Sequence, residues 1–174
     1  MAATDVIKIA LERNWGMVDR AVDGLDDATL ARRVTDKTNS MAWLIWHMNR
    51  VVDIFVNTRL RSHNQIWLQD GWHQKFGMSD DPGNQGGGWT ADQVGAWVPP
   101  PRDVLLGYYE ATKSAAREYL SSLSDADLDA SVTLPPANEP RPVHDLLGIL
   151  VYDNVVHGGQ IAFLRGYHEG MGWF

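Results

Sequence analysis

The stretch that decides the fold is "VHDLLGILVYDNVVHGGQIAFLRGY", residues 143–167, in which apolar side chains recur at helical spacing. Steps of three and four define one stripe, which in a bundle helix is the seam that faces the core. Its members are Val143, Leu146, Leu150, Asp153, His157, Gln160 and Leu164. Three consecutive members are polar, and buried polar groups are costly unless they find partners. The stripe therefore predicts both a core helix and a special site on it.

Three further segments carry the same periodicity, from about residue 4 to 25, from 39 or 40 to about 61, and from just after "PPPR" (99–102) to near 123. Short Asp-containing turns, "LDDATLARRV" (25–34) and "LSDADLDASV" (123–132), precede the second and fourth helices. A long connection over about 62–101 separates the second helix from the third, and no strand-like alternation persists anywhere. The pattern predicts an all-α fold, a four-helix bundle forming a single domain over residues 1–174.

The composition excludes several classes of protein. A net charge of −7 and a pI of about 5.2 argue against the basic face that nucleic-acid-binding proteins use to neutralise phosphates. No apolar run is long enough to span a bilayer, and the first residues do not resemble a secretion signal. The chain has no cysteine, which excludes a disulfide, thiolate ligand or catalytic thiol of its own. We expect a cytoplasmic protein that binds neither nucleic acid nor membranes.

Asp153 and His157 are candidate ligands of a divalent metal. An ionised carboxylate in an apolar setting is expensive, and a metal ion removes that cost while using neutral imidazoles as further ligands. His47 lies on the corresponding seam of the second helix, with Leu44 and Val51. Bundles build metal sites from such facing side chains, and three protein ligands leave positions open for water or substrate. The alternative is a set of core side chains that satisfy one another without a metal.

Two amides lie on the same seams. Gln160 follows the pair on the fourth helix, and Asn14 interrupts the seam of the first helix. Either can orient a ligand or substrate from outside the metal's own coordination shell, or can be a hydrogen-bonded core amide. Gly158 and Gly159 lack a Cβ, which predicts that a neighbouring helix or bulky side chain comes close beside the ligand turn.

The residues "SMAWLIWHMNRVVD" (40–53) and "VVHGGQIAFLRG" (155–166) resemble the DinB-like (DinB/YfiT) superfamily of four-helix metalloproteins. The resemblance covers nearly the whole chain and includes "GWHQKFGM" (71–78). It implies that His47 and His157 are metal ligands, usually of zinc or nickel. The third ligand of the family is four residues before the last His and is often His, or Glu in the mycothiol-dependent maleylpyruvate isomerase group. Here that position is Asp153, whose side chain is one methylene shorter than Glu.

The resemblance also implies activities and partners. Relatives of this kind are thiol-dependent transferases or isomerases that use mycothiol or bacillithiol, and homodimers are common. The resulting hypothesis is an enzyme in which the metal binds a low-molecular-weight thiol, which then attacks a small electrophile. The alternatives are a non-catalytic, stress-related bundle that binds a metal or ligand, and a structural homodimer with a vestigial metal site.

Two features outside the seams remain. Arg50 is expected to form a solvated salt bridge or to anchor an acidic substrate. The glycine-rich segment "GNQGGGW" (83–89) is expected to be a flexible rim or lid near the site, or a simple surface loop.

Overall fold

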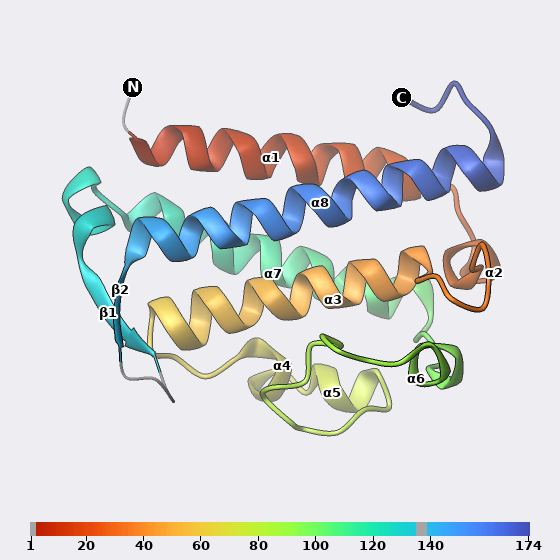
Figure 1. The fold of residues 1–174 in the computed structure, drawn as a ribbon, viewed down its shortest axis with the longest axis horizontal. Helices are drawn as coiled ribbons and strands as arrows, with labels where there is room; N and C mark the ends of the chain where they lie inside the picture. Colours follow the sequence, from red (N-terminus) through yellow and green to blue (C-terminus); the bar gives the residue numbers. More distant parts are fainter. Residues whose placement is uncertain (1–2, 135–138) are drawn as a thin grey trace.

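Four long helices lie side by side in a computed structural model that describes residues 3–134 and 139–174 (Figure 1). The second of them continues as a π-helical segment, η1, over its last turns. The bounds are α1 (Ala3–Val22), α3 (Met41–Asp53) with η1 (Ile54–Leu60), α7 (Arg102–Ser122) and α8 (Val143–Glu169). The predicted all-α bundle is confirmed. The domain predicted over 1–174 includes residues 1–2 and 135–138, which lie outside the described ranges.

Short helical segments occupy the connections, and two of them correspond to the turns predicted before the second and fourth helices. Those before α3 and α8 begin at an Asp26 cap and at a Ser124 capping box. Between η1 and α7 the chain forms further short helices, the last of which starts at a capping box made by Thr90 and Gln93. The bounds are α2 (Asp27–Ala31), α4 (Ile66–Gln69), α5 (Trp72–Lys75), α6 (Ala91–Ala96) and the 3₁₀ turn η2 (Asp125–Asp129).

The structure also contains a short pair of strands that was not identified from the sequence. Strands β1 (Ser131–Leu134) and β2 (Glu139–Pro142) pair antiparallel, with Ser131 opposite Pro142, and lead directly into α8. Each strand is four residues long and largely exposed, and β2 contains two prolines. Such short segments carry too few residues for a period of two to be recognised.

Helix α3 is the centre of the molecule, because every one of its residues is buried. It packs against α7 and α8, and the 62–101 connection covers its remaining face. Gly86 in that connection lies against Trp43 and Trp46 of α3. Polar side chains on α3 therefore need partners inside the protein, which is why both polar clusters described below start from this helix.

The buried stripe of α8 differs from the predicted seam in the second half of the helix. Leu146 and Leu150 are buried as predicted, but the stripe then continues through Asn154, Gly158 and Ile161. A seam of 3.5-residue period drifts by about 20° per heptad on a straight α-helix, which explains the difference. Asp153 and His157 consequently lie at the edge of the core, and Gln160 is exposed.

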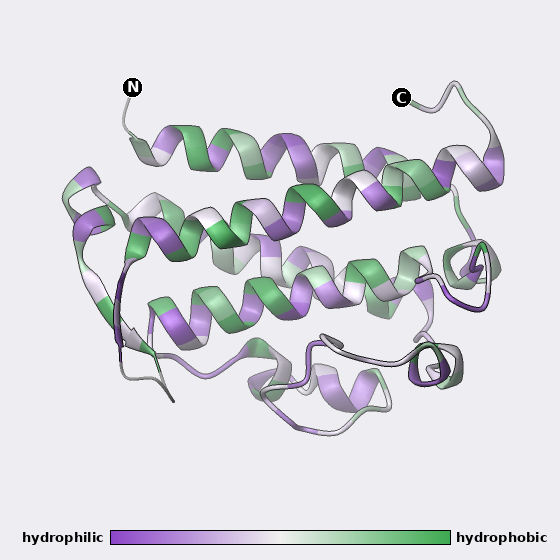
Figure 2. Ribbon diagram, viewed as in Figure 1, coloured by the Kyte–Doolittle hydropathy of each residue, from purple (hydrophilic) through white to green (hydrophobic). Residues whose placement is uncertain are grey.

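Hydrophobic residues are distributed along the whole length of α8 (Figure 2), and several of them are exposed. Despite this apolar character, no helix within residues 3–134 and 139–174 combines the length and hydropathy needed to cross a membrane.

Candidate metal centre

Three predicted ligands come together between α3 and α8. The Nε2 atom of His47 lies 3.6 Å from Oδ1 of Asp153, and Nε2 of His157 lies 3.5 Å from the same oxygen. The two imidazole rings meet edge to face, with centroids 4.7 Å apart. One ligand atom from each residue lies within 4.8 Å of the other two. The cluster could therefore hold a metal ion.

The outer nitrogen of each imidazole is held by a carbonyl oxygen. Nδ1 of His47 lies 2.5 Å from the backbone oxygen of Gln85, and Nδ1 of His157 lies 2.8 Å from Oε1 of Gln160. Because a carbonyl oxygen only accepts hydrogen bonds, both Nδ1 atoms carry the proton in the neutral rings. Both Nε2 atoms then present lone pairs towards Asp153, as metal-bound histidines do.

Asp153 is incompletely satisfied by its protein neighbours. Its Oδ2 atom is buried and has no hydrogen-bond partner in the part of the chain that the structure describes. Its Oδ1 atom lies 3.5 to 3.6 Å from both imidazoles, which is longer than an ordinary hydrogen bond. Two ligands of one tetrahedral zinc ion lie about 3.4 Å apart, given zinc–ligand distances of about 2.1 Å. The spacing and the unpartnered oxygen both fit a shared cation.

The electrostatics of the pair favour charge on both members. Burial raises the pKa of Asp153, but the interactions with His157 and His47 in their protonated forms outweigh it and leave the pKa below its ordinary value. Burial lowers the pKa of His157, yet the interactions with Asp153 and Gln160 outweigh it and leave this pKa raised. Although its side chain is one methylene shorter than that of Glu, Asp153 is close enough to both imidazoles to interact with them.

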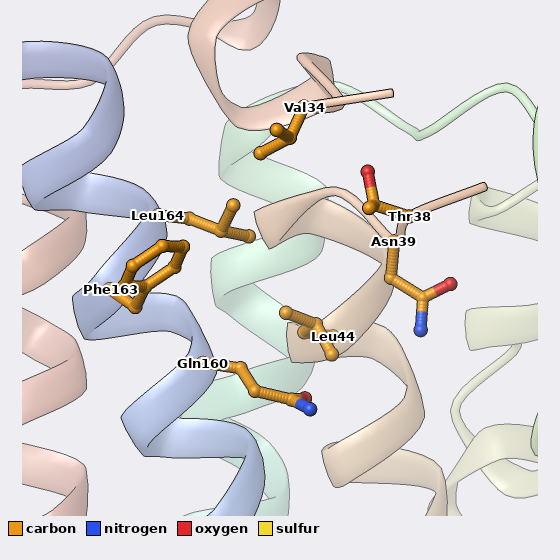
Figure 3. Close-up of a pocket in the computed structure, with 7 residues that line it drawn as sticks. All are labelled: Val34, Thr38, Asn39, Leu44, Gln160, Phe163 and Leu164. Atoms are coloured by element: carbon orange, nitrogen blue, oxygen red, sulfur yellow. The ribbon is translucent and has the colours of Figure 1, made fainter. Parts of the chain in front are cut away.

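A pocket of about 310 Å³ adjoins the cluster between α8, α3 and the 32–40 connection (Figure 3). Gln160 belongs to both, because it lines the pocket and contacts His157. The three ligand side chains are between 10 and 19 % exposed, so the cluster is shielded but not sealed. The other pocket residues are Val34, Thr38, Asn39, Leu44, Phe163 and Leu164.

The two predicted amides lie in different places. Gln160 contacts His157 directly, as described. Asn14 is buried at the contact of α1 with α8, where its Nδ2 donates to the Asn154 carbonyl at 2.9 Å. A Cβ on Gly158 would lie 2.0 Å from the Asn14 Oδ1, which confirms the predicted close approach there. No such neighbour approaches Gly159 within the described residues, so that part of the prediction was wrong. A role for Asn14 at the metal stays a prediction.

Sequence reasoning missed the contributions of Gln85 and Arg50. Gln85 acts through its backbone oxygen, which no side-chain pattern can reveal. The prediction of a solvated Arg50 was wrong, because this side chain is fully buried. The available signal was the spacing of Arg50 and Asp53 after His47 on a helix whose other residues are mostly apolar. Trp43, also on this helix, stacks on the His47 ring with centroids 5.0 Å apart.

The comparisons with known proteins agree with this architecture. No curated protein matches the chain. The crystal structure of a conserved protein from Enterococcus faecalis aligns over 98 % of this chain and 99 % of that chain, with a TM-score of 0.84 and 21 % identity. At that identity the likeness concerns the fold alone. A family model described as the DinB superfamily matches residues 10–161, a range that contains all three candidate ligands. The chain therefore belongs to the DinB superfamily.

Proposed function

We propose that this protein is a metal-dependent thiol S-transferase or isomerase that acts on small electrophiles. His47, Asp153 and His157 would hold a divalent metal, with zinc or nickel favoured by the nitrogen-rich ligand set. The thiol would be a low-molecular-weight one such as mycothiol or bacillithiol, which is compatible with a chain that has no cysteine of its own. The observation that carries the proposal is the convergence of two imidazole lone pairs on a carboxylate with an unpartnered buried oxygen.

The chemistry follows from the ligand set. A divalent metal held by His47, Asp153 and His157 would leave a position open and would supply Lewis-acid chemistry that lowers the pKa of a bound thiol towards neutrality. The protein residues hold the required protonation states: Gln85 and Gln160 keep the protons of both imidazoles on Nδ1. Trp43, stacked on His47, shields the cluster from bulk water.

The adjoining pocket supports a small organic substrate. Its lining carries no charged residue, and four of its members are Val34, Leu44, Phe163 and Leu164. Thr38, Asn39 and Gln160 supply hydrogen-bonding groups at its rim. Apolar walls with a few polar groups are typical of small-molecule sites. The pocket therefore favours an uncharged electrophile with an apolar body and one or two polar atoms.

The test combines metal analysis with an activity assay. The purified protein should contain or take up one metal ion per chain by elemental analysis. The loaded protein should accelerate conjugation of mycothiol or bacillithiol to a bimane-type electrophile, and His47→Ala should lose both properties. Metal binding without thiol transfer would favour the alternative of a non-catalytic metal-binding bundle. Absence of metal binding would leave the vestigial-site alternative and refute the proposal.

We also propose a homodimer that uses the outer face of α8. Five of its exposed apolar residues form one stripe, in which Tyr152 is the most exposed member at 71 %. In a two-fold dimer the same surface of both subunits meets, so this apolar stripe would pack against its copy on a second chain. Tyr152→Glu should convert a dimer into a monomer in light-scattering measurements, whereas a wild-type monomer would refute this assembly. The stripe comprises Ile149, Tyr152, Val156, Phe163 and Tyr167.

A further inference from the structure

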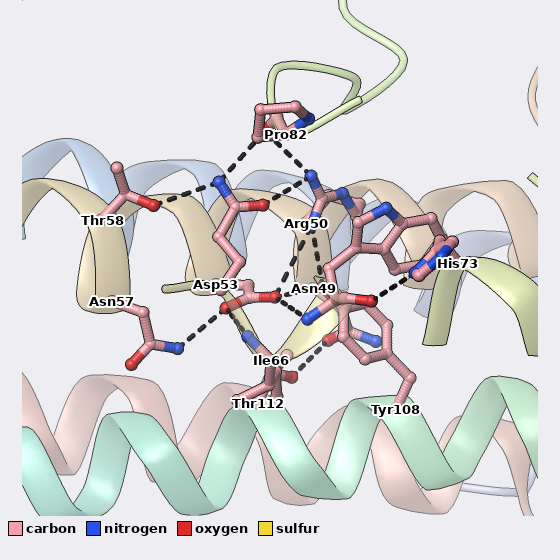
Figure 4. Close-up of polar contacts among 12 residues, drawn as sticks. Asn49, Arg50, Asp53, Asn57, Thr58, Ile66, His73, Pro82, Tyr108 and Thr112 are labelled. Atoms are coloured by element: carbon pink, nitrogen blue, oxygen red, sulfur yellow. Dashed lines mark hydrogen bonds and ion pairs between the residues drawn. The ribbon is translucent and has the colours of Figure 1, made fainter. Parts of the chain in front are cut away.

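Arg50 is the most deeply buried charged group on α3, with no exposed surface. Its guanidinium lies 3.5 Å from the carboxylate of Asp53 and 4.6 Å from the centroid of the Trp67 ring. It also donates to the Tyr108 hydroxyl at 3.3 Å and to the Gln65 side-chain oxygen at 2.9 Å. Figure 4 shows this network between α3 and α7. A cation buried so completely, and partnered on every side, holds its surroundings in one arrangement.

Two of its hydrogen bonds go to the backbone of the glycine-rich connection. Nε donates to the Asn84 carbonyl at 2.9 Å, and Nη2 donates to the Pro82 carbonyl at 3.0 Å. Figure 4 shows Pro82 above the guanidinium. The segment is therefore attached to the core through main-chain atoms, independently of its own side chains. The expectation of a flexible lid is not supported at these residues.

The far end of the same segment is fixed by packing. Gly86 has a positive φ of 83°, and a Cβ there would lie 2.7 Å from ring atoms of both Trp43 and Trp46. Only glycine combines that backbone conformation with such a close approach. Residues 82–86 are thus held at one end by Arg50 and at the other by two tryptophans of α3.

Gln85 lies between these two attachments, and its carbonyl oxygen is the group that contacts Nδ1 of His47. We propose that Arg50 is a positioning residue for the metal centre. It fixes residues 82–86, so that the Gln85 carbonyl holds His47 with Nε2 directed at Asp153. The inference rests on the proposed metal-binding function. In this proposal the buried Arg50–Asp53 ion pair controls the orientation of His47, which lies one helical turn earlier on α3.

The role requires the planar fork of arginine. Its N–H groups point in fixed directions, so that one side chain reaches Asp53, Gln65 and two backbone carbonyls together. A lysine at this position would keep the positive charge beside Asp53 but would lose most of these directed contacts. Arg50→Lys therefore separates the charge from the positioning of the loop.

The first experiment titrates zinc into the folded wild-type chain and its variants by competition with a chromophoric chelator. Loss of a group that orients a metal ligand typically weakens binding about 10- to 100-fold, and we expect that range for Arg50→Lys. Lys113→Met is the control, because Lys113 is also a buried cation, paired with Asp19 at 2.9 Å, and does not contact the connection. It should bind zinc as the wild type does.

The second experiment perturbs the same segment from its other end. Gly86→Ala should also weaken zinc binding, because the added methyl group pushes the backbone beside Gln85 away from Trp43 and Trp46. Gly88→Ala is the matched control, since Gly88 has a similar φ of 78° but no described neighbour within 4 Å of the added atom. The pair separates displacement of the Gln85 carbonyl from backbone strain alone. Circular dichroism of each variant establishes that it is folded.

A third readout needs no metal. Nitrogen chemical shifts of the His47 ring, at a pH about two units above the ordinary histidine pKa of about 6.5, report which nitrogen carries the proton. We expect the Nδ1–H form in the wild type and a mixture in Arg50→Lys and Gly86→Ala. If both variants bind zinc as the wild type does and keep its tautomer, the inference is wrong. If the wild type does not bind zinc, the proposed function fails, and the tautomer alone then supports or overturns the positioning role.

Discussion

Helix α3 takes part in two buried carboxylate clusters that differ in completeness. Asp53 accepts hydrogen bonds from the Tyr108 hydroxyl, the Asn57 amide and the backbone N–H groups of residues 66 and 67, and it faces Arg50. Asp153, which meets His47 from α8, has one oxygen 3.5 to 3.6 Å from two imidazoles and a second with no partner among the described residues. The first cluster is satisfied by the protein itself, and the second is not.

The difference distinguishes structure from function. A buried ionic network is stable only when its charges and hydrogen bonds are matched, as they are around Arg50 and Asp53. A protein gains nothing in stability from leaving a carboxylate oxygen unpartnered, and such an oxygen stays available to a ligand. On this interpretation the Arg50–Asp53 network stabilises the fold around α3, and the cluster of His47, Asp153 and His157 supplies the metal ligands.

The largest expected effect compares the two carboxylates in metal-free protein. Asp53→Asn should lower the free energy of unfolding by about 3–5 kcal/mol, because it leaves Arg50 buried without its counter-charge. Asp153→Asn should cost much less, because the cluster that it alters is incomplete. Urea denaturation of both variants measures the difference. Equal losses would contradict the distinction between the clusters.

Zinc should change the comparison. At a free concentration of 100 times the dissociation constant, a ligand that binds only the folded state adds about 2.7 kcal/mol to the free energy of unfolding. We expect this increment in the wild type and in Lys113→Met, and we expect Asp153→Asn to lose most of it. Thermal or urea unfolding with and without zinc provides the measurement. An increment that survives in Asp153→Asn would place the metal elsewhere.

Gln160 should contribute less than a direct ligand. Gln160→Leu removes the acceptor of the His157 Nδ1 proton and should weaken zinc binding about tenfold, equivalent to about 1.4 kcal/mol. Gln160→Glu keeps an oxygen acceptor at the same position and should retain most of the affinity. Chelator competition compares the two. A Leu variant with unchanged affinity would mean that Gln160 serves the pocket alone.

The smallest expected effect is a pH dependence of opposite sign with and without metal. The pKa of His157 is raised above its ordinary 6.5, so its contribution to metal-free stability is present below 6.5 and is lost as pH rises through the raised value. Protons compete with zinc for the same imidazole, so the stabilisation by zinc should grow over that range. Urea denaturation measures the free energy of unfolding of the wild type and of His157→Gln at each pH, and the difference between the two isolates the contribution of His157. If this difference changes with pH in the same direction with and without zinc, the prediction is wrong.

The sequence predicted the helices and the three candidate ligands because both depend on side-chain periodicity. Leu146 and Leu150 mark the core face of α8, and the stripe to which they belong led to Asp153 and His157. The α3 seam placed His47 opposite them. The spacing works here because a helix fixes which side chains share a face, whatever the rest of the chain does.

The remaining parts depend on tertiary contacts that have no local signature. The Gln85 carbonyl and the attachment of residues 82–86 to Arg50 bring together main-chain atoms and a side chain more than thirty positions away. Gln160 was placed on the core seam but lies outside it, because a 3.5-residue repeat drifts on a straight helix. The short β1–β2 pair is joined through its backbone, and the alternation of Val132 and Leu134 in β1, which pack against the core, is too brief to identify a strand from sequence.

The central claim is that His47, Asp153 and His157 form one metal site. Calorimetric titration of zinc into the metal-free wild type and into the three single alanine variants tests it most directly. The account predicts one zinc ion per wild-type chain and a loss of affinity of more than about 100-fold in every variant, beyond what an outer partner costs. A wild type that takes up no zinc, or variants that bind it with unchanged affinity and stoichiometry, would contradict the account.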